Sequence, residues 1–176
     1  MGTFALPEKQ SQVRFGAKLQ TVSCDNCGVT APEELLLGIA EGSESLADAL
    51  GVDRAALDRL VDEAMARASS GQLEEAERSL QDLAVVHGTS ALLPCLLAGV
   101  RAERGDALGA ASAYTEALRR AEVHGAEASF VAELLLLRAA ARRGTEDAAG
   151  AREDLLAASR LEGTAAEEAR RLLGMQ

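Results

Sequence analysis

The sequence predicts an all-α fold assembled from repeated helical hairpins, and three observations support this prediction. Good helix formers (Ala, Leu, Glu and Arg) dominate a composition that is 48% hydrophobic. Aromatic residues make up only 2% of the chain, and the residue types that favour β-strands are scarce. A pattern of glycine, alanine and leucine also recurs at a fixed interval. With 176 residues, the chain is long enough to bury a core of its own.

The recurring pattern consists of a glycine, an alanine and two further positions that are apolar in both copies. The first copy is Gly71, Ala76, Leu80 and Leu83, and the second is Gly105, Ala110, Tyr114 and Ala117. The offset is 34 residues at every position, for example from 71 to 105, and this is the period of tetratricopeptide repeats. The glycine permits a tight turn between two helices, and the small alanine lets the second helix approach the first. The pattern therefore predicts a tetratricopeptide-like solenoid of helical hairpins.

A third copy follows with altered spacing. Gly144 takes the place of the turn glycine in this copy. The positions that match the second helix of the first copy are Ala148, Ala151, Leu155 and Ala158. Seven residues instead of five separate the glycine from the small alanine, so we expect a looser turn and a longer first helix. The alternative is a plain helical bundle whose alanine-rich helices resemble one another by accident.

The repeats account for most of the chain. Residues 31–176 are predicted to form one tetratricopeptide-like domain with N-terminal helices, about three repeats and a C-terminal capping helix. Residues 1–30 mix polar residues, glycine and isolated apolar residues without a period, which indicates a flexible or loosely packed arm. The predicted repeats span about 57–90, 91–124 and 126–161, and the cap spans 164–174.

The net charge of −10, without any basic run, argues against a nucleic-acid partner, because phosphate backbones are bound by clustered Lys and Arg. An anionic membrane surface would repel the same charge. No apolar stretch reaches the length of a membrane span, and the first residues lack the pattern of a secretory signal. We therefore expect a cytoplasmic protein, in which three cysteines, an odd number, are reduced thiols.

The order of the elements adds a family resemblance. A predicted helix at 32–41 precedes a short SLADALGV segment, with Asp53 as the N-cap of the long helix that follows. The junction DALGV–DRAALDRL is the most characteristic stretch, and two more hairpins and a cap complete the layout. From Leu46 to about Leu161 the chain resembles the class II chaperones of type III secretion systems, which hold translocator proteins. The resemblance implies a concave groove that binds an extended peptide of a client protein.

Transferred by repeat position, the resemblance implies that the first helix of each repeat lines the groove. The implied residues are Val61, Met65, Ala68, Leu92, Cys95, Leu96, Gly99, Leu134, Arg138 and Arg142. Most are apolar or small, as a peptide-binding surface requires, and the two arginines could bind acidic or carbonyl groups. The alternative for each residue is packing against a neighbouring helix. The predicted function is a scaffold or chaperone that holds an extended or helical client segment. The alternative is a non-secretion adaptor that tethers a signalling, polarity or structural partner.

The predicted helix at 32–41 has apolar residues on more than one side, namely Leu35, Leu36, Leu37 and Ile39. A short helix of this kind needs cover on more than one face, so it docks on the repeats or pairs with another copy. The family resemblance favours pairing, and a homodimer is therefore expected.

Cys24 and Cys27 have the spacing of half a zinc site. Zinc requires four ligands, and a second pair is missing from the chain, although two such arms in a dimer would supply four thiolates. Two ordinary thiols in a turn is the simpler interpretation. The sequence contains no phosphate-binding loop and no nucleophile–base arrangement with a supporting motif. We therefore predict no enzymatic activity, no cofactor and no metal.

Overall fold

The computed structural model describes residues 45–175, and these residues form eight α-helices and no strand. The helices are α2 (Leu46–Ala49), α3 (Arg54–Ser69), α4 (Leu73–Val86), α5 (Leu92–Glu103), α6 (Ala107–Val123), α7 (Ala128–Gly144), α8 (Ala148–Ser159) and α9 (Thr164–Leu172). The predicted all-α class is therefore confirmed. The predicted arm at 1–30 and the predicted helix at 32–41 lie outside the described residues. Within residues 45–175, no helix combines the length and the apolarity needed to cross a bilayer.

The first two described helices begin at side-chain caps. Ser45 caps α2 by accepting a hydrogen bond from the backbone N–H of Asp48 at 3.1 Å. Asp53 caps α3 by accepting one from the N–H of Ala55 at 3.2 Å, which confirms the predicted N-cap. Such caps satisfy amides that have no partner inside the helix. Gly51 joins the two helices with a φ of 65°, a left-handed conformation that glycine adopts without steric cost.

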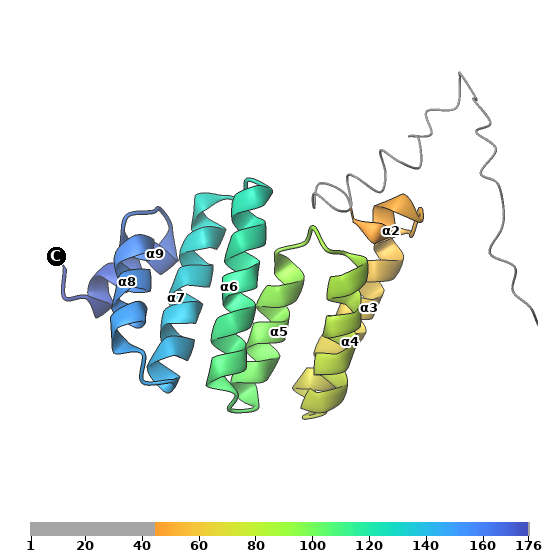
Figure 1. Cartoon of the computed structure of the whole chain (residues 1–176), viewed down its shortest axis with the longest axis horizontal. Coiled ribbons are helices and arrows are strands. Elements are labelled where there is room, and N and C mark those ends of the chain that lie inside the picture. The colour runs from red at the N-terminus through yellow and green to blue at the C-terminus, as the bar shows by residue number, and fades with distance from the viewer. Residues whose placement is uncertain (1–44, 176) are drawn as a thin grey trace, which may run out of the picture. The chain divides into compact units, whose positions relative to one another are not determined.

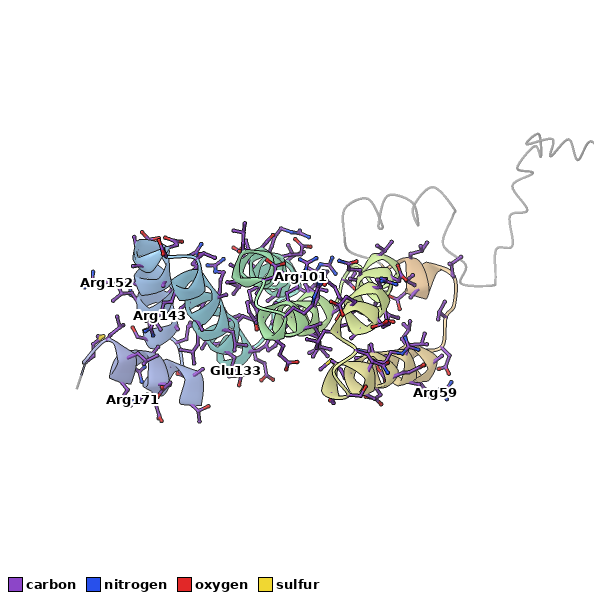
Figure 2. The ribbon with its side chains drawn as sticks, turned by 90° about the horizontal axis from the view of Figure 1, so that it is seen from below. Arg59, Arg101, Glu133, Arg143, Arg152 and Arg171 are labelled. Atoms are coloured by element: carbon purple, nitrogen blue, oxygen red, sulfur yellow. The ribbon has the colours of Figure 1, made fainter. Side chains whose placement is uncertain are left out.

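The remaining helices form three hairpins, α3–α4, α5–α6 and α7–α8, followed by α9. Each helix packs against the next one along the chain, and α9 also packs against α7. Figure 1 shows the hairpins side by side in chain order. In Figure 2 the hairpins are seen from below, with α3 and α5 on one side and α4 and α6 on the other. We refer to α3, α5, α7 and α9 as the first helices, and to α4, α6 and α8 as the second helices.

The turns of the first two hairpins agree with the prediction. Gly71 and Gly105 have φ angles of 85° and 81°, so each adopts the left-handed conformation that commonly ends a helix. Asp106 follows and caps α6 by accepting a hydrogen bond from the N–H of Gly109 at 2.8 Å. The turn glycine therefore has the role that the repeat pattern assigned to it.

The third turn differs from the prediction. Gly144 is the last residue of α7, and the left-handed position is Glu146, with a φ of 63°. Asp147 then caps α8 as Asp106 caps α6. Glycine is needed at 144 for another reason, because a Cβ there would lie 2.9 Å from the Cβ of Ala107, where α7 approaches α6. Counted between turn residues, from 105 to 146, the third repeat follows the second after 41 residues.

The core consists mainly of alanine and leucine side chains at the places where the hairpins meet. The alanine five residues after each left-handed turn residue is buried in all three hairpins, at Ala76, Ala110 and Ala151. Leu80 and Leu134 are the largest fully buried apolar side chains among the described residues. Small side chains allow close helix contact, so the core consists of many short contacts at high packing density. Several leucines outside this core remain on the surface of the first helices.

Candidate functional site

The solvent-exposed side of the first helices carries large apolar side chains. Leu92 on α5, Leu137 on α7 and Leu172 on α9 are 51%, 41% and 44% exposed. Hollows of about 250 and 200 Å³ lie between α3 and α5 and between α7 and α9, and one of about 280 Å³ lies between α7 and the end of α5 with its turn into α6. Residues of the second helices also line all three hollows. We use the name first-helix face for the residues of these four helices that line the three hollows, together with the half-buried Met65, Cys95, Leu96 and Gly99. Apolar side chains gathered in this way are typical of surfaces that bind another protein.

The hollow between α3 and α5, named the N-terminal hollow, contains two of the predicted groove residues. Val61 from α3 and Leu92 from α5 both line it. Asp58 and Asp62, one turn apart on α3, are also among its lining residues and are exposed. The other lining residues are Arg54, Leu57, Leu83, His87, Ser90 and Leu93. The structure therefore brings Val61 and Leu92 together in a largely apolar hollow with carboxylates beside it.

The middle of α3 and α5 holds four further predicted residues. Met65, Cys95 and Leu96 are half-buried and pack against the main core. Gly99 is half-buried too, and a Cβ at this position would meet no atom within 4 Å, so the surface is open there. Burial raises the pKa of the Cys95 thiol to about 11, and the charge of Glu133 on α7 adds to the shift. Cys95 is therefore a neutral, weakly polar side chain on this face.

Four predicted groove residues are not available on an open surface. Leu134 is 0% exposed and Ala68 is 6% exposed, so both side chains belong to the core. Arg138 binds both carboxylate oxygens of Asp154 on α8 at 2.6 and 3.0 Å, and Arg142 donates to the same carboxylate at 3.0 Å. Asp154 is only 3% exposed. The two arginines therefore join α7 to α8 within the chain and are not presented to a client.

The misplaced turn residue explains the error in α7. With Gly144 as the turn, Val61 and Met65 correspond to Leu134 and Arg138. With Glu146 as the turn, they correspond to Leu136 and Ala140, two residues further along. The structure agrees with the second register, because Ala140 lines the hollows on both sides of α7 and Leu136 lines the one shared with α9. The sequence-based groove therefore missed Leu136, Leu137 and Ala140.

A longer motif in the sequence contains the correct register. RAERGDALGA at 101–110 aligns with RRGTEDAAGA at 142–151, with the first arginine, the aspartate and the last glycine all 41 residues apart. In the structure, Arg101 donates to the backbone oxygen of Gly109 at 3.3 Å, and Arg142 donates to that of Gly150 at 3.0 Å. The same hydrogen bond closes both hairpins. The arginine and the aspartate therefore identify the turn better than a glycine alone.

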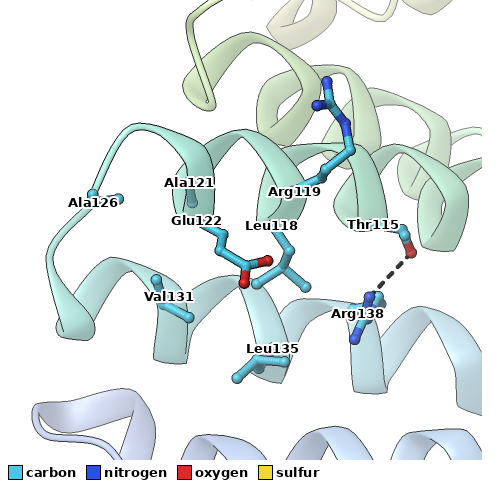
Figure 3. A pocket seen from close by; sticks show the side chains of 10 residues that line it. Thr115, Leu118, Arg119, Ala121, Glu122, Ala126, Val131, Leu135 and Arg138 are labelled. Atoms are coloured by element: carbon cyan, nitrogen blue, oxygen red, sulfur yellow. Dashed lines mark hydrogen bonds between the residues drawn. The ribbon is translucent and has the colours of Figure 1, made fainter.

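A fourth hollow, of about 510 Å³, lies between α6 and α7. Its floor is apolar, and Figure 3 shows Arg138 reaching Thr115 at one end of it, where the guanidinium donates to Oγ1 at 3.2 Å. Both arginines that line this hollow are bound within the chain, Arg138 to Asp154 and Arg119 to Glu116. The first-helix face is the stronger candidate site, because Asp58 and Asp62 beside its leucines form no ion pair with any residue between 45 and 175.

The remaining predicted residues lie outside the part of the chain that the structure describes. They are Leu35, Leu36, Leu37 and Ile39, expected to self-associate, and Cys24 and Cys27, the weak metal candidates. Between residues 45 and 175, no group of three His, Cys, Asp or Glu side chains is placed to hold a metal ion.

No protein-family model and no curated protein matches the sequence. Solved structures do match, and they define the class of fold as tetratricopeptide-like. The first tetratricopeptide domain of Spaghetti, bound to the HSP90 peptide SRMEEVD, aligns with a TM-score of 0.57 and 19% identity, over 70% of this chain and 94% of that one. The predicted repeat fold is therefore confirmed.

Two further matches are type III secretion proteins. A secretion-system complex from Aeromonas hydrophila aligns with a TM-score of 0.65 and 19% identity, over 79% of this chain and 89% of that one. The Yersinia enterocolitica translocator chaperone SycD, in complex with a peptide of the translocator YopD, aligns with a TM-score of 0.56 and 18% identity, over 70% of this chain and 87% of that one. The chain thus resembles these type III secretion proteins in its fold, as the layout of the sequence predicted.

Proposed function

We propose that this chain is a protein-binding scaffold that holds a peptide segment of a client protein on the first-helix face. The observation that carries the proposal is the exposure of Leu92, Leu137 and Leu172 on successive first helices, each beside a hollow. Each Å² of apolar surface covered by a client is worth about 25 cal/mol, so a segment lying along this face gains free energy at every junction. The peptides bound by SycD and by Spaghetti support this use of the fold.

The chemistry of the face supports binding rather than catalysis. With its pKa raised to about 11, the Cys95 thiol is almost entirely protonated near neutral pH and is a poor nucleophile. His87, the residue that follows α4, lines the N-terminal hollow, and its Nδ1 is buried and has no hydrogen-bond partner among the described residues. A nucleophile activated by a neighbouring base is thus not assembled here. We therefore propose a scaffold without enzymatic activity.

In its finer form, the proposal is that the client is a translocator-like protein, held in the bacterial cytoplasm before secretion. The resemblance in fold to SycD supports this form. The alternative is an adaptor that tethers a signalling, polarity or structural partner. Neighbouring genes separate the two, because genes for a secretion apparatus and its translocators are expected only in the first case.

Placing a carboxylate on the face tests the proposal. We expect Met65→Glu, Leu96→Glu and Leu137→Glu each to release the partner that co-purifies with the chain, because a charge covered by a bound segment is costly. Leu108→Glu is the matched control, since Leu108 is 74% exposed at the start of the second helix α6. Circular dichroism establishes that each variant is folded. If the three folded variants retain the partner as well as the control does, the first-helix face is not the binding surface.

Self-association through the predicted helix at 32–41 is a separate proposal, supported by its apolar residues and by the family resemblance. We expect the full chain to have the hydrodynamic size of a dimer and Leu36→Glu to reduce it to that of a monomer. An unchanged size would contradict the proposal.

A further inference from the structure

We infer that the N-terminal hollow is a specificity pocket for a basic side chain, Lys or Arg, of the bound segment. The inference names the chemistry of the client at one end of the first-helix face, so its biological role rests on the proposed function. The pocket itself can be tested without any client.

The floor of the hollow fits the stem of a long basic side chain. Five apolar side chains line its volume of about 250 Å³, contributed by α3, α4 and α5: Leu57, Val61, Leu83, Leu92 and Leu93. Lys and Arg side chains pack their methylene groups against apolar surface while the charged head stays at the edge in contact with water. A hollow with this floor and an acidic edge matches both halves of such a side chain.

The carboxylates beside the floor are free to receive the charged head. Asp58 and Asp62 both line the hollow, and neither forms an ion pair within 4 Å with any residue between 45 and 175. Asp154 and Glu77, by contrast, are each engaged by arginines within the fold. A cation held between two carboxylates one helical turn apart would form charge-assisted hydrogen bonds. Among the described lining residues, Arg54 is the one arginine or lysine; it forms no ion pair within 4 Å there and competes for the same position.

The hydrogen-bonding chemistry of Asp58 and Asp62 also favours a donor-rich occupant. Ammonium and guanidinium groups only donate hydrogen bonds, whereas a carboxylate only accepts them. The acidic peptide bound by Spaghetti, with its Glu-Glu-Val-Asp end, is therefore the wrong chemistry for this hollow.

The probe for the experiment is n-butylammonium, which reproduces a lysine side chain, and n-butyrate is the control with the opposite charge. Each is titrated into the full-length ¹⁵N-labelled chain while amide signals are followed by NMR. We expect saturable shifts around residues 58–62 and 92–93 with butylammonium, and none there with butyrate. In Asp58→Asn/Asp62→Asn the saturable shifts are expected to be lost, whereas Arg54→Gln should bind butylammonium more tightly than the natural chain.

A second double variant controls for the general attraction of cations to an acidic protein. Glu153→Gln/Glu162→Gln removes the same charge from exposed positions on and beyond α8, and it should leave the titration unchanged. Shifts that do not saturate, that centre elsewhere, or that fall equally in both double variants would overturn the pocket. Such a result leaves the effect of Leu96→Glu on partner binding intact. Conversely, failure of the Leu96→Glu experiment leaves the butylammonium titration unchanged, so the two failures are distinguishable.

Discussion

At the scale of single residues, Glu146 shows how this chain departs from a regular repeat. It adopts a left-handed φ of 63° at the position that glycine occupies in the other two hairpins. A residue with a Cβ pays roughly 1–2 kcal/mol for this conformation, because the Cβ crowds the following carbonyl oxygen. Two neighbouring hydrogen bonds hold the turn in place despite this cost: Asp147 accepts one from the N–H of Gly150, and Arg142 donates one to the backbone oxygen of Gly150.

Replacing Glu146 by glycine should therefore stabilise the fold. Relief of the left-handed strain exceeds the extra entropy of glycine in the unfolded chain, which is about 0.4–1 kcal/mol, so we expect a gain of about 0.5–1 kcal/mol in the free energy of unfolding. Gly105→Ala is the matched control, since it places a Cβ at the equivalent turn and should lower the free energy by about 1 kcal/mol. Urea denaturation measures both. A loss of stability in both variants would contradict the explanation.

Cys95 leads to a second prediction at this scale. Because burial raises the pKa of its thiol to about 11, the alkylation rate of Cys95 in the folded chain should keep rising from pH 9 to pH 11. In urea the thiol regains its ordinary pKa of 9.0, and the rate should level off above that value. Iodoacetamide labelling, followed by mass spectrometry of the peptide that contains Cys95, separates it from Cys24 and Cys27. A plateau near pH 9 in the folded chain would contradict the burial of this thiol.

At the scale of elements, α7 marks the limit of what the sequence alone could predict. The turns at Gly71 and Gly105 were predictable because local glycines define them, and Val61 and Leu92, both assigned to the groove, line one hollow. Gly144 misled the prediction, because the residue with a left-handed φ in this turn is Glu146, and residues other than glycine rarely adopt that conformation. Positions along a helix are counted from its turn, so placing the turn two residues too early shifted every groove assignment on α7 by the same amount.

The burial of individual side chains was the other property of the site that the sequence pattern could not predict. Ala68 occupies a groove position by spacing, yet α3 turns its side chain into the core, where it is 6% exposed. Arg138 and Arg142 were expected to be free because Asp154, their partner, lies in the next helix, and sequence gives no distance between α7 and α8. Contacts between helices therefore decided which predicted residues reach the surface.

The ion pairs between α7 and α8 lead to a prediction for this hairpin. Removing the carboxylate in Asp154→Ala leaves Arg138 and Arg142, 15% and 25% exposed, without their shared carboxylate, and only Asp147 remains near Arg142, at 3.5 Å. We expect the free energy of unfolding to fall by about 3 kcal/mol, the low end for a broken buried pair. Glu153→Gln, at an exposed neighbour on the same helix, should change it by less than about 0.5 kcal/mol. Equal midpoints of urea denaturation for the two variants would show that the pair does not stabilise the hairpin.

At the scale of the whole molecule, arginines offset much of the repulsion expected from a net charge of −10. Glu77 on α4 binds Arg101 and Arg104, so that its charge links the first hairpin to the second. Burial raises the pKa of Glu77, but the hydrogen bonds from the two arginines outweigh it and the net shift is downward. Glu116 shows the same effect more strongly, because hydrogen bonds from Arg119 and Arg120 lower its pKa to about 2.

These lowered pKa values make the fold sensitive to acid in a defined range. Since the pKa of Glu116 falls from 4.5 to about 2 on folding, its charged form stabilises the fold above pH 4.5, and this contribution is lost as the pH falls toward 2. The side chain is 37% exposed, so solvent screening limits the contribution to about 1 kcal/mol.

Glu116→Gln should therefore lower the free energy of unfolding by about 1 kcal/mol near neutral pH, and the difference between this variant and the natural chain should shrink below pH 4.5. Glu122→Gln, on the same helix but without an ion pair to any described residue, should show little difference at any pH. Urea denaturation across this range decides the matter, because a difference for Glu116→Gln that stays constant with pH would mean that its ion pairs are not what stabilises the fold.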